Sequence, residues 1–299
     1  MRRTDLLQSL DTLRLVTRGE PFNLRNLVHS ISPPVEQYIA VCDNDPEHPC
    51  YAQVISRVDE TQGQMTFLGA YEDADQTDIA CLLENLIANA GKWGTHYITG
   101  DLPTDSPHIS GFKKAGFLTW ANQTVFRFSP AVADVGSPKF PWRTWNANDM
   151  RAMTCLYRGI VPGLFQPIEP LTRKAALGLA LYHAEGELLG YADLDSGPKG
   201  VWVQPVLSPE ANDPQILSDL LKAIPDLYNR PVFMAARSYQ PWLASLAAQL
   251  PAEICGTQFL LVRYLVRQLK VAEPQAFALY EGANIERSMP VSQINQKTH

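Results

Sequence analysis

Cysteine and histidine are the residues with which this sequence could hold a metal ion, and their spacing does not predict a metal site. Cys42 and Cys50 bracket the segment DNDPEHP, which contains His48. Two cysteines separated by seven residues, with one histidine between them, do not match the ligand spacing of structural zinc sites. We interpret the segment as the acidic tip of a hairpin and expect no metal ligands.

Two aspartates alternate with apolar residues in the segment GYADLDSG. Asp193 and Asp195 would lie on one face of an expected strand, with Ala192 and Leu194 on the other. That polar face either borders a groove or faces water. The isolated histidines add no catalytic arrangement, because no serine–histidine–aspartate triad can be inferred from them: His29, His96, His108 and His183.

The elements that must position such residues follow from hydrophobic periodicity. In the first half, the expected helices are residues 4–16, 23–31, 77–90 and 106–115, and the expected strands are 38–42, 51–58, 65–70, 96–99 and 118–128. In the second half, the expected helices are 148–159, 214–227 and 239–250, and the expected strands are 142–145, 177–184, 188–195, 201–207, 231–236 and 257–265.

The two halves follow the same order at spacings that agree within two residues, and the strands led by Tyr97 and Val232 lie 135 residues apart. The expected helix starts at Thr77 and Pro214 lie 137 residues apart, and the closing strands, compared from Val125 and Val262, lie 137 residues apart as well. Such agreement indicates a duplicated domain of mixed α/β type.

We therefore expect an α/β fold in which each of two domains contains a mixed sheet. The expected parts are a first domain at 1–130, a linker at 131–140, a second domain at 141–270 and a loosely ordered tail at 271–299.

Composition and charge restrict the partners of the chain. With 299 residues, 45% of them hydrophobic, it is long enough for two folded domains. A net charge of −6 without long basic clusters argues against nucleic acid. No apolar run approaches the ~20 residues that span a bilayer, so we expect no membrane partner. Five scattered cysteines suit a reducing compartment, and we expect a cytoplasmic protein. The oligomeric state is left open.

The order of elements and several segments resemble the GNAT (Gcn5-related N-acetyltransferase) superfamily, in a tandem arrangement. The segments are LLENLIANAGKWGTHYITGDLP and FKKAGF in the first half, and WRTWNANDMRAMTCLY, VWVQPVL and RPVFMAARSYQPWLASLAAQL in the second. The resemblance covers residues 20–128 and 141–267. It implies two acyl-CoA N-acyltransferase folds and the transfer of an acyl group from acyl-CoA to an amine.

Both halves depart from the phosphate-binding loop of the family, a Q/R-x-x-G-x-G/A segment at a helix N-terminus. The first loop reads GAYEDADQTD and brings acidic side chains to the position of the diphosphate. The second, VLSPEANDPQ, lacks the glycines and any arginine, and Asp213 before Pro214 is expected to cap the helix. We expect the first half to have lost acyl-CoA and the second loop to be structural.

The family's tyrosine, which protonates the departing CoA thiolate, is also missing. Its position is Phe112 in the first half and lies near Ala247 in the second. Tyr239 is close in sequence, at the start of an expected helix. It is a candidate catalytic residue, with packing or a place in the groove as the alternative.

If transfer is retained, the resemblance implies a site in the second half. Glu169 lies in the loop that forms one wall of the acceptor groove in the family, so it either contacts a substrate amine or is an exposed loop glutamate. The full set of candidates is Glu169 and Tyr239 as catalytic residues, the backbone at Val203, Gln204 and Val206 for the cofactor, and Phe165, Tyr191 and Arg237 for the substrate.

Functions from different classes remain open. If active, the protein is an acyl-CoA-dependent N-acyltransferase that uses acetyl-CoA and a small-molecule amine. The alternative is a catalytically inactive GNAT-like protein that binds a small metabolite or a partner protein in the remnant groove, as the loss of both loops and both tyrosines favours. A third interpretation, a dimerisation scaffold without a ligand, would require large exposed apolar patches.

Overall fold

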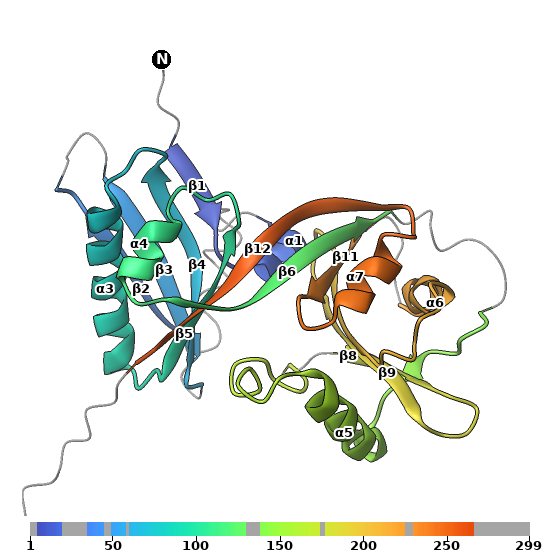
Figure 1. The fold of residues 1–299 in the computed structure, drawn as a ribbon. Helices are drawn as coiled ribbons and strands as arrows, with labels where there is room; N and C mark the ends of the chain where they lie inside the picture. The colour runs from blue at the N-terminus through green and yellow to red at the C-terminus, as the bar shows by residue number, and fades with distance from the viewer. Residues whose placement is uncertain are drawn as a thin grey trace, which may run out of the picture. The chain divides into compact units, whose positions relative to one another are not determined.

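The structure is a computed structural model, and it describes residues 5–19, 35–44, 49–57, 60–129, 138–173, 177–224 and 230–265. These residues form a mixed α/β architecture with a 12-stranded sheet (Figure 1). The expected helix at 23–31, most of the linker and the tail at 271–299 lie outside the described residues. No helix in the described ranges is long and apolar enough to span a membrane.

The first half contains six strands and three helices among its described residues. They are β1 Asp5–Ser9, α1 Thr12–Arg18, β2 Val35–Cys42, β3 Cys50–Arg57, β4 Gln62–Tyr71, α3 Gln76–Lys92, β5 Tyr97–Pro103, α4 Ile109–Lys114 and β6 Leu118–Phe128. In the hairpin of β2 and β3, Cys42 lies opposite Cys50, which confirms the expected hairpin; His48 is outside the described residues.

The expected helix at 4–16 is wrong, because its first part is strand β1. Residues Asp5–Ser9 pair antiparallel with β4, from Asp5 opposite Tyr71 to Ser9 opposite Phe67. Apolar residues at helical spacing suggested a helix, but the open hydrogen-bonding edge of β4 decides the local conformation. The helix starts later, where the side chain of Asp11 caps α1 by accepting a bond from the Arg14 N–H.

The second half follows the predicted order closely. Its elements are β7 Arg143–Thr144, the 3-10 turn Ala147–Asp149, α5 Met150–Ile160, β8 Leu177–Tyr182, β9 Leu188–Ser196, β10 Val201–Leu207, α6 Gln215–Ala223, β11 Val232–Arg237, α7 Pro241–Ala247 and β12 Ala252–Tyr264. Because α7 begins at Pro241, Tyr239 lies in the turn before the helix and not in its first turn.

The closing strands of the two halves are exchanged within one continuous sheet. The strand order is β2-β3-β4-β5-β12-β6-β11-β10-β9-β8-β7, with β1 on β4. The last strand, β12, therefore lies between β5 and β6 of the first half, and β6 pairs with β11 of the second half. Figure 1 shows β6 and β12 as long neighbouring strands. The predicted boundaries of two separate domains stay a prediction.

Each half contains one short parallel pairing, after which the two strands separate. In the first half, Gln62–Gln64 of β4 pairs with Tyr97–Thr99 of β5. In the second half, Val201–Val203 of β10 pairs with Val232–Met234 of β11. Beyond these residues no ladder joins the strands of either pair, and a gap opens between them. We call these two positions the gap of the first half and the gap of the second half.

Candidate functional site

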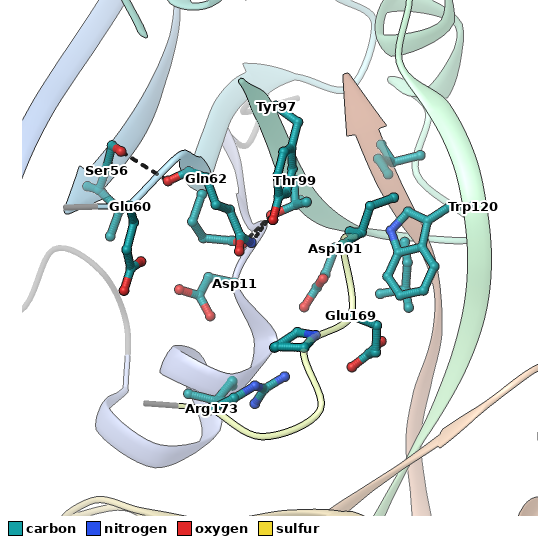
Figure 2. A pocket seen from close by; sticks show the side chains of 18 of the residues that line it. Asp11, Ser56, Glu60, Gln62, Tyr97, Thr99, Asp101, Trp120, Glu169 and Arg173 are labelled. Carbon is teal, nitrogen blue, oxygen red and sulfur yellow. Dashed lines mark hydrogen bonds between the residues drawn. The ribbon is translucent and has the colours of Figure 1, made fainter. Parts of the chain in front are cut away.

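A pocket of about 580 Å³ lies over the sheet of the first half, next to α1 and the loop at 168–173. Both halves contribute to its wall. The polar and aromatic residues that line it include Asp11, Gln62, Tyr97, Thr99, Asp101, Trp120, Glu169, Arg173 and Arg237. Figure 2 shows Asp11, Asp101, Glu169 and Arg173 directed toward a common space.

Two aspartates give the pocket an acidic side. Asp11 Oδ1 accepts the Arg14 N–H at 3.0 Å, and Asp101 Oδ2 accepts the Thr12 N–H at 3.1 Å. Burial raises the pKa of Asp11 to about 6, against the backbone bond from Arg14. Burial also raises the pKa of Asp101, although the Arg237 charge opposes it. Neither carboxylate forms an ion pair within the described residues, although the Arg173 charge opposes the rise in the pKa of both.

Glu169 and Arg237, both candidates from the sequence, form a buried ion pair on the pocket wall. Arg237 Nε lies 3.2 Å from Glu169 Oε2, and Arg237 Nη2 donates to Glu169 Oε1 at 3.3 Å. The Arg237 side chain is 6% exposed and the Glu169 side chain is 5% exposed. The interpretation of Glu169 as an exposed loop glutamate is therefore wrong. A carboxylate tolerates burial where a cation and hydrogen-bond donors meet it, as they do here.

Hydrogen bonds through three glutamines and one threonine extend this pair into a network between the halves. Gln204 Nε2 donates to Glu169 Oε1, and its own Oε1 accepts Arg237 Nη2 at 3.2 Å. Arg237 Nη1 donates to Gln123, whose Nε2 donates in turn to Gln258. Gln258 Oε1 also accepts the Thr12 hydroxyl at 2.9 Å. The buried side chain of Gln204 thus holds Glu169, a contact different from the backbone role expected for it.

The predicted aromatic residues divide between the pocket border and the core. Phe165 packs against Tyr239 and Trp120, with ring centroids 6.3 and 5.4 Å apart. Burial raises the pKa of Tyr239, so its hydroxyl stays protonated. Tyr191 is 1% exposed and packs with Val206 in the cluster beneath α5. The structure therefore brings Phe165 and Tyr239 together and places Tyr191 in the core.

The gap of the second half is closed by one side chain. Leu207 N–H donates to Gln240 Oε1 at 3.0 Å, and Gln240 Nε2 donates to Pro205 O at 3.2 Å. Pro205 has no N–H to offer. The Val201 N–H points toward β11, where it donates to Pro231 O. Successive N–H groups along a strand point to opposite sides, so the N–H groups of Gln204 and Val206 point toward β9.

A backbone cradle at Val203–Val206 therefore has no support in this geometry. Val203 is fully buried, at 0% exposed, and lies in the parallel pairing with β11. On the edge of β10 that faces the gap, Leu207 carries the N–H group that a ligand carbonyl would reach after displacement of Gln240.

The gap of the first half is filled by the main chain. Leu10 N–H donates to Thr66 O at 2.9 Å, and Asp101 N–H donates to Leu10 O at 2.9 Å. Gln64 Nε2 adds a third bond to Leu10 O at 3.0 Å. Leu10, directly after β1, therefore bridges β4 and β5. The loss of acyl-CoA from the first half stays a prediction.

Aspartate side chains satisfy the N-termini of both helices that follow the gaps. Asp75 Oδ1 accepts the Thr77 N–H at 2.7 Å at the start of α3. Asp213 Oδ1 accepts the Gln215 N–H at 2.9 Å just before α6, whose N-cap is Pro214, and Lys139 Nζ lies 2.7 Å from Asp213 Oδ2. A diphosphate at either position would meet a carboxylate, which repels it.

Sequence reasoning missed Asp11, Asp101 and Arg173. One pattern could have indicated Asp101: it is a lone acid directly after the apolar run in THYITGDLP, where a strand residue is expected to be buried. Asp11 could be recognised only as a helix cap, once the start of α1 is known. The loop residue Arg173 has no local pattern around it.

No protein-family model matches the sequence, and no curated protein matches it. The structure is similar to a conserved protein of unknown function from Staphylococcus epidermidis, with a TM-score of 0.53, 9% identity, and coverage of 72% of this chain and 91% of the other. It is also similar to a GCN5-related N-acetyltransferase from Kribbella flavida, with a TM-score of 0.50, 10% identity, and coverage of 82% and 94%.

A third solved structure is a tandem GNAT protein from the clavulanic acid biosynthesis pathway, with a TM-score of 0.47, 14% identity, and coverage of 87% of this chain and 98% of the other. At these identities the likeness concerns the fold. The chain has the mixed α/β fold of the GCN5-related N-acetyltransferases. That fold is typical of acyltransferases, and it does not by itself determine the activity of this chain.

Proposed function

We propose that this protein binds a small amine in the pocket beside α1 and, as its fold suggests, transfers an acyl group to that amine from acyl-CoA. The observation that carries the proposal is the pair of carboxylates, Asp11 and Asp101, which face the pocket without an ion-pair partner in the described part of the chain. A protonated amine supplies the charge that two partly buried carboxylates lack.

The size and walls of the pocket suit such a ligand. A volume of about 580 Å³ accommodates a small organic molecule. Trp120 and Tyr97 provide aromatic surface, and Trp120 already receives the Arg237 guanidinium, 5.9 Å from its ring centroid. Ring faces of this kind also attract ammonium groups. The pocket thus combines acidic groups for the amine with aromatic surface for its carbon skeleton.

We assign the acyl donor to the second half. In the first half the gap is occupied by β1, which pairs with β4, and by Leu10, which is hydrogen-bonded to Thr66 of β4 and Asp101 of β5. In the second half only the side chain of Gln240 closes the gap. A side chain can rotate away where a paired strand cannot, and Leu207 N–H would then be available to a carbonyl of the pantetheine arm.

Binding of the amine without acyl transfer is the second candidate function. The aspartates at the starts of α3 and α6 favour it, since both helix N-termini are already satisfied by carboxylates. Lys139 forms an ion pair with the second of these aspartates, Asp213.

The test is an acetylation assay by mass spectrometry, with acetyl-CoA and a panel of small amines, combined with isothermal titration of the same amines. Acetylated product that is lost in the Asp101→Asn variant supports transfer. Binding that depends on Asp101 without product supports the second candidate. The exposed Asp105 gives a matched control, Asp105→Asn, which should change neither result. Absence of both binding and product would contradict the proposal.

A further inference from the structure

A second, much smaller cavity lies behind the pocket wall. It measures about 10 Å³ and is enclosed by side chains of α5, the 168–173 loop, β9 and β10. We call it the rear chamber; its polar lining residues are Tyr157, Glu169, Arg173, Tyr191, Asp193 and Gln204. Glu169 and Arg173 also line the large pocket, so these two residues separate the two spaces. A cavity of this size holds about one water molecule.

Four buried polar atoms around the rear chamber have no hydrogen-bond partner in the described structure. They are Glu169 Oε2, Arg173 Nη1, Tyr191 Oη and Asp193 Oδ1. Glu169 Oε2 has its ion-pair contact with Arg237, but no hydrogen bond. Buried polar atoms without partners are uncommon in folded proteins, and four around one small cavity indicate a shared partner.

In hydrogen-bonding capacity, one water molecule matches all four atoms. A water has two protons to donate, which match the acceptors Glu169 Oε2 and Asp193 Oδ1, and two lone pairs, which match the donors Arg173 Nη1 and Tyr191 Oη. None of these four atoms would then remain without a hydrogen-bond partner. A bare cation does not fit equally well, because the positive guanidinium of Arg173 would face it.

We propose that the rear chamber holds one ordered water that links Glu169 on the pocket wall to Asp193 behind it, so that a proton released in the pocket can reach Asp193. The presence of the water does not depend on the proposed function, whereas the proton route rests on that function. An N–H bond of the bound ammonium breaks, and its proton binds to the Glu169 carboxylate. Glu169 passes a proton to the water, and the water passes one to Asp193, which ends as a neutral acid.

The surroundings of Asp193 suit a temporary proton acceptor. Burial raises the pKa of this carboxyl to about 6, the Arg173 N–H and charge oppose the rise, and the Glu169 charge adds to it. Besides Glu169 and Arg173, the polar side chains of Tyr157, Tyr191 and Gln204 also line the chamber. Near neutral pH the Asp193 carboxylate is therefore ionised, and it accepts a proton more readily than an exposed aspartate does.

The water can be tested without any ligand. A crystal structure of the full chain at a resolution that shows waters should contain one water within hydrogen-bond distance of all four atoms, and Tyr191→Phe should retain it with three partners. The matched control is Tyr182→Phe, since this hydroxyl bonds to Asp149 outside the chamber. An empty chamber in the wild type would overturn the proposal, whatever the acetylation assay gives.

The link between the two carboxylates has its own measurement. In a carboxyl-carbon NMR titration, the signal that Asp193→Asn removes should have its midpoint near pH 6, and Glu169→Gln should lower that midpoint because a negative neighbour is lost. A midpoint close to the ordinary value of about 3.9 would contradict the coupling. If acetylation is detected, Asp193→Asn should reduce kcat at least ten-fold with little change in KM; an unchanged kcat would refute the proton route and leave the water.

Discussion

Arg237 Nε lies 3.2 Å from Glu169 Oε2, in a pair whose side chains are 6% and 5% exposed. The two residues are 68 positions apart in the sequence. One lies at the end of β11 and the other in a loop; both line the large pocket, and Glu169 also lines the rear chamber.

Removing one partner of the pair should destabilise the protein strongly. Glu169→Ala leaves the Arg237 guanidinium buried without its carboxylate, and the expected cost is about 3–5 kcal/mol in the free energy of unfolding. Denaturant unfolding measures it. The control is Glu253→Ala, which breaks the exposed pair between Arg127 and Glu253 and should cost less than about 1 kcal/mol. Equal losses in the two variants would contradict the buried pair.

Shortening Leu10, the residue directly after β1, should show whether this segment occupies the gap of the first half. The side chain is 0% exposed and belongs to the first-half core, so Leu10→Ala should lower the free energy of unfolding by about 2–5 kcal/mol. Leu164, at 84% exposed, provides the matched control, and Leu164→Ala should be close to neutral. A neutral Leu10→Ala would mean that the N-terminal segment does not occupy the gap.

Gln240→Ala should open the second gap at a cost in stability. Leu207 N–H and Pro205 O lose their partner, which is expected to cost about 1–3 kcal/mol in unfolding experiments. If the gap receives an acyl donor, the same variant should bind CoA more tightly than the wild type in isothermal titration. The exposed Gln249 serves as the control through Gln249→Ala. Unchanged CoA binding would speak against a donor site in the second half.

Stability should fall as pH rises from about 4 to 6. Burial raises the folded-state pKa of Asp11 and of Asp193 to about 6, whereas the unfolded chain has the ordinary value of about 3.9. Between these values the folded state binds more protons than the unfolded state, so each added pH unit favours unfolding. Unfolding midpoints measured across this range check the slope, which the double variant Asp11→Asn, Asp193→Asn should reduce. An unchanged slope would contradict the assignment.

Asp149 should contribute in the opposite direction. Hydrogen bonds from the Arg143 guanidinium lower its pKa, with Tyr182 and the Asn146 N–H adding to the effect. Stability from this carboxylate is therefore present at neutral pH and is lost as pH falls below about 4. Asp149→Asn should remove that acid dependence and destabilise the fold at pH 7 by about 1–3 kcal/mol. Unfolding at pH 3 and pH 7 separates the two effects, and a loss of equal size at both would refute the assignment.

The sequence predicted most elements because their periodicity is local. The expected strand at 118–128 coincides with β6, Leu118–Phe128, and the three-strand order of the second half matches β8, β9 and β10. Prediction failed at β1, where helical spacing of leucines competes with an unpaired edge of β4 that is distant in sequence. The exchange of β6 and β12 was also invisible, because closing strands of similar pattern can fill either position.

The site was predictable only in part, for the same physical reason. The family resemblance placed Glu169 and Arg237 in one groove, and the structure does bring them together. Their ion pair has no local signature, so a loop position suggested exposure for Glu169. Asp11 and Asp101 become neighbours only when α1 packs beside β5 and Thr12 bonds to Asp101. The catalytic and binding roles of the predicted residues stay predictions.

The most direct test of the central claim is isothermal titration of the full chain with a panel of small amines, in the wild type and in Asp101→Asn. The account predicts that at least one amine binds with one site per chain and that Asp101→Asn weakens its affinity at least ten-fold, while Asp105→Asn leaves it unchanged. Equal affinity in the wild type and Asp101→Asn, or no binding of any amine at millimolar concentration, would contradict the account.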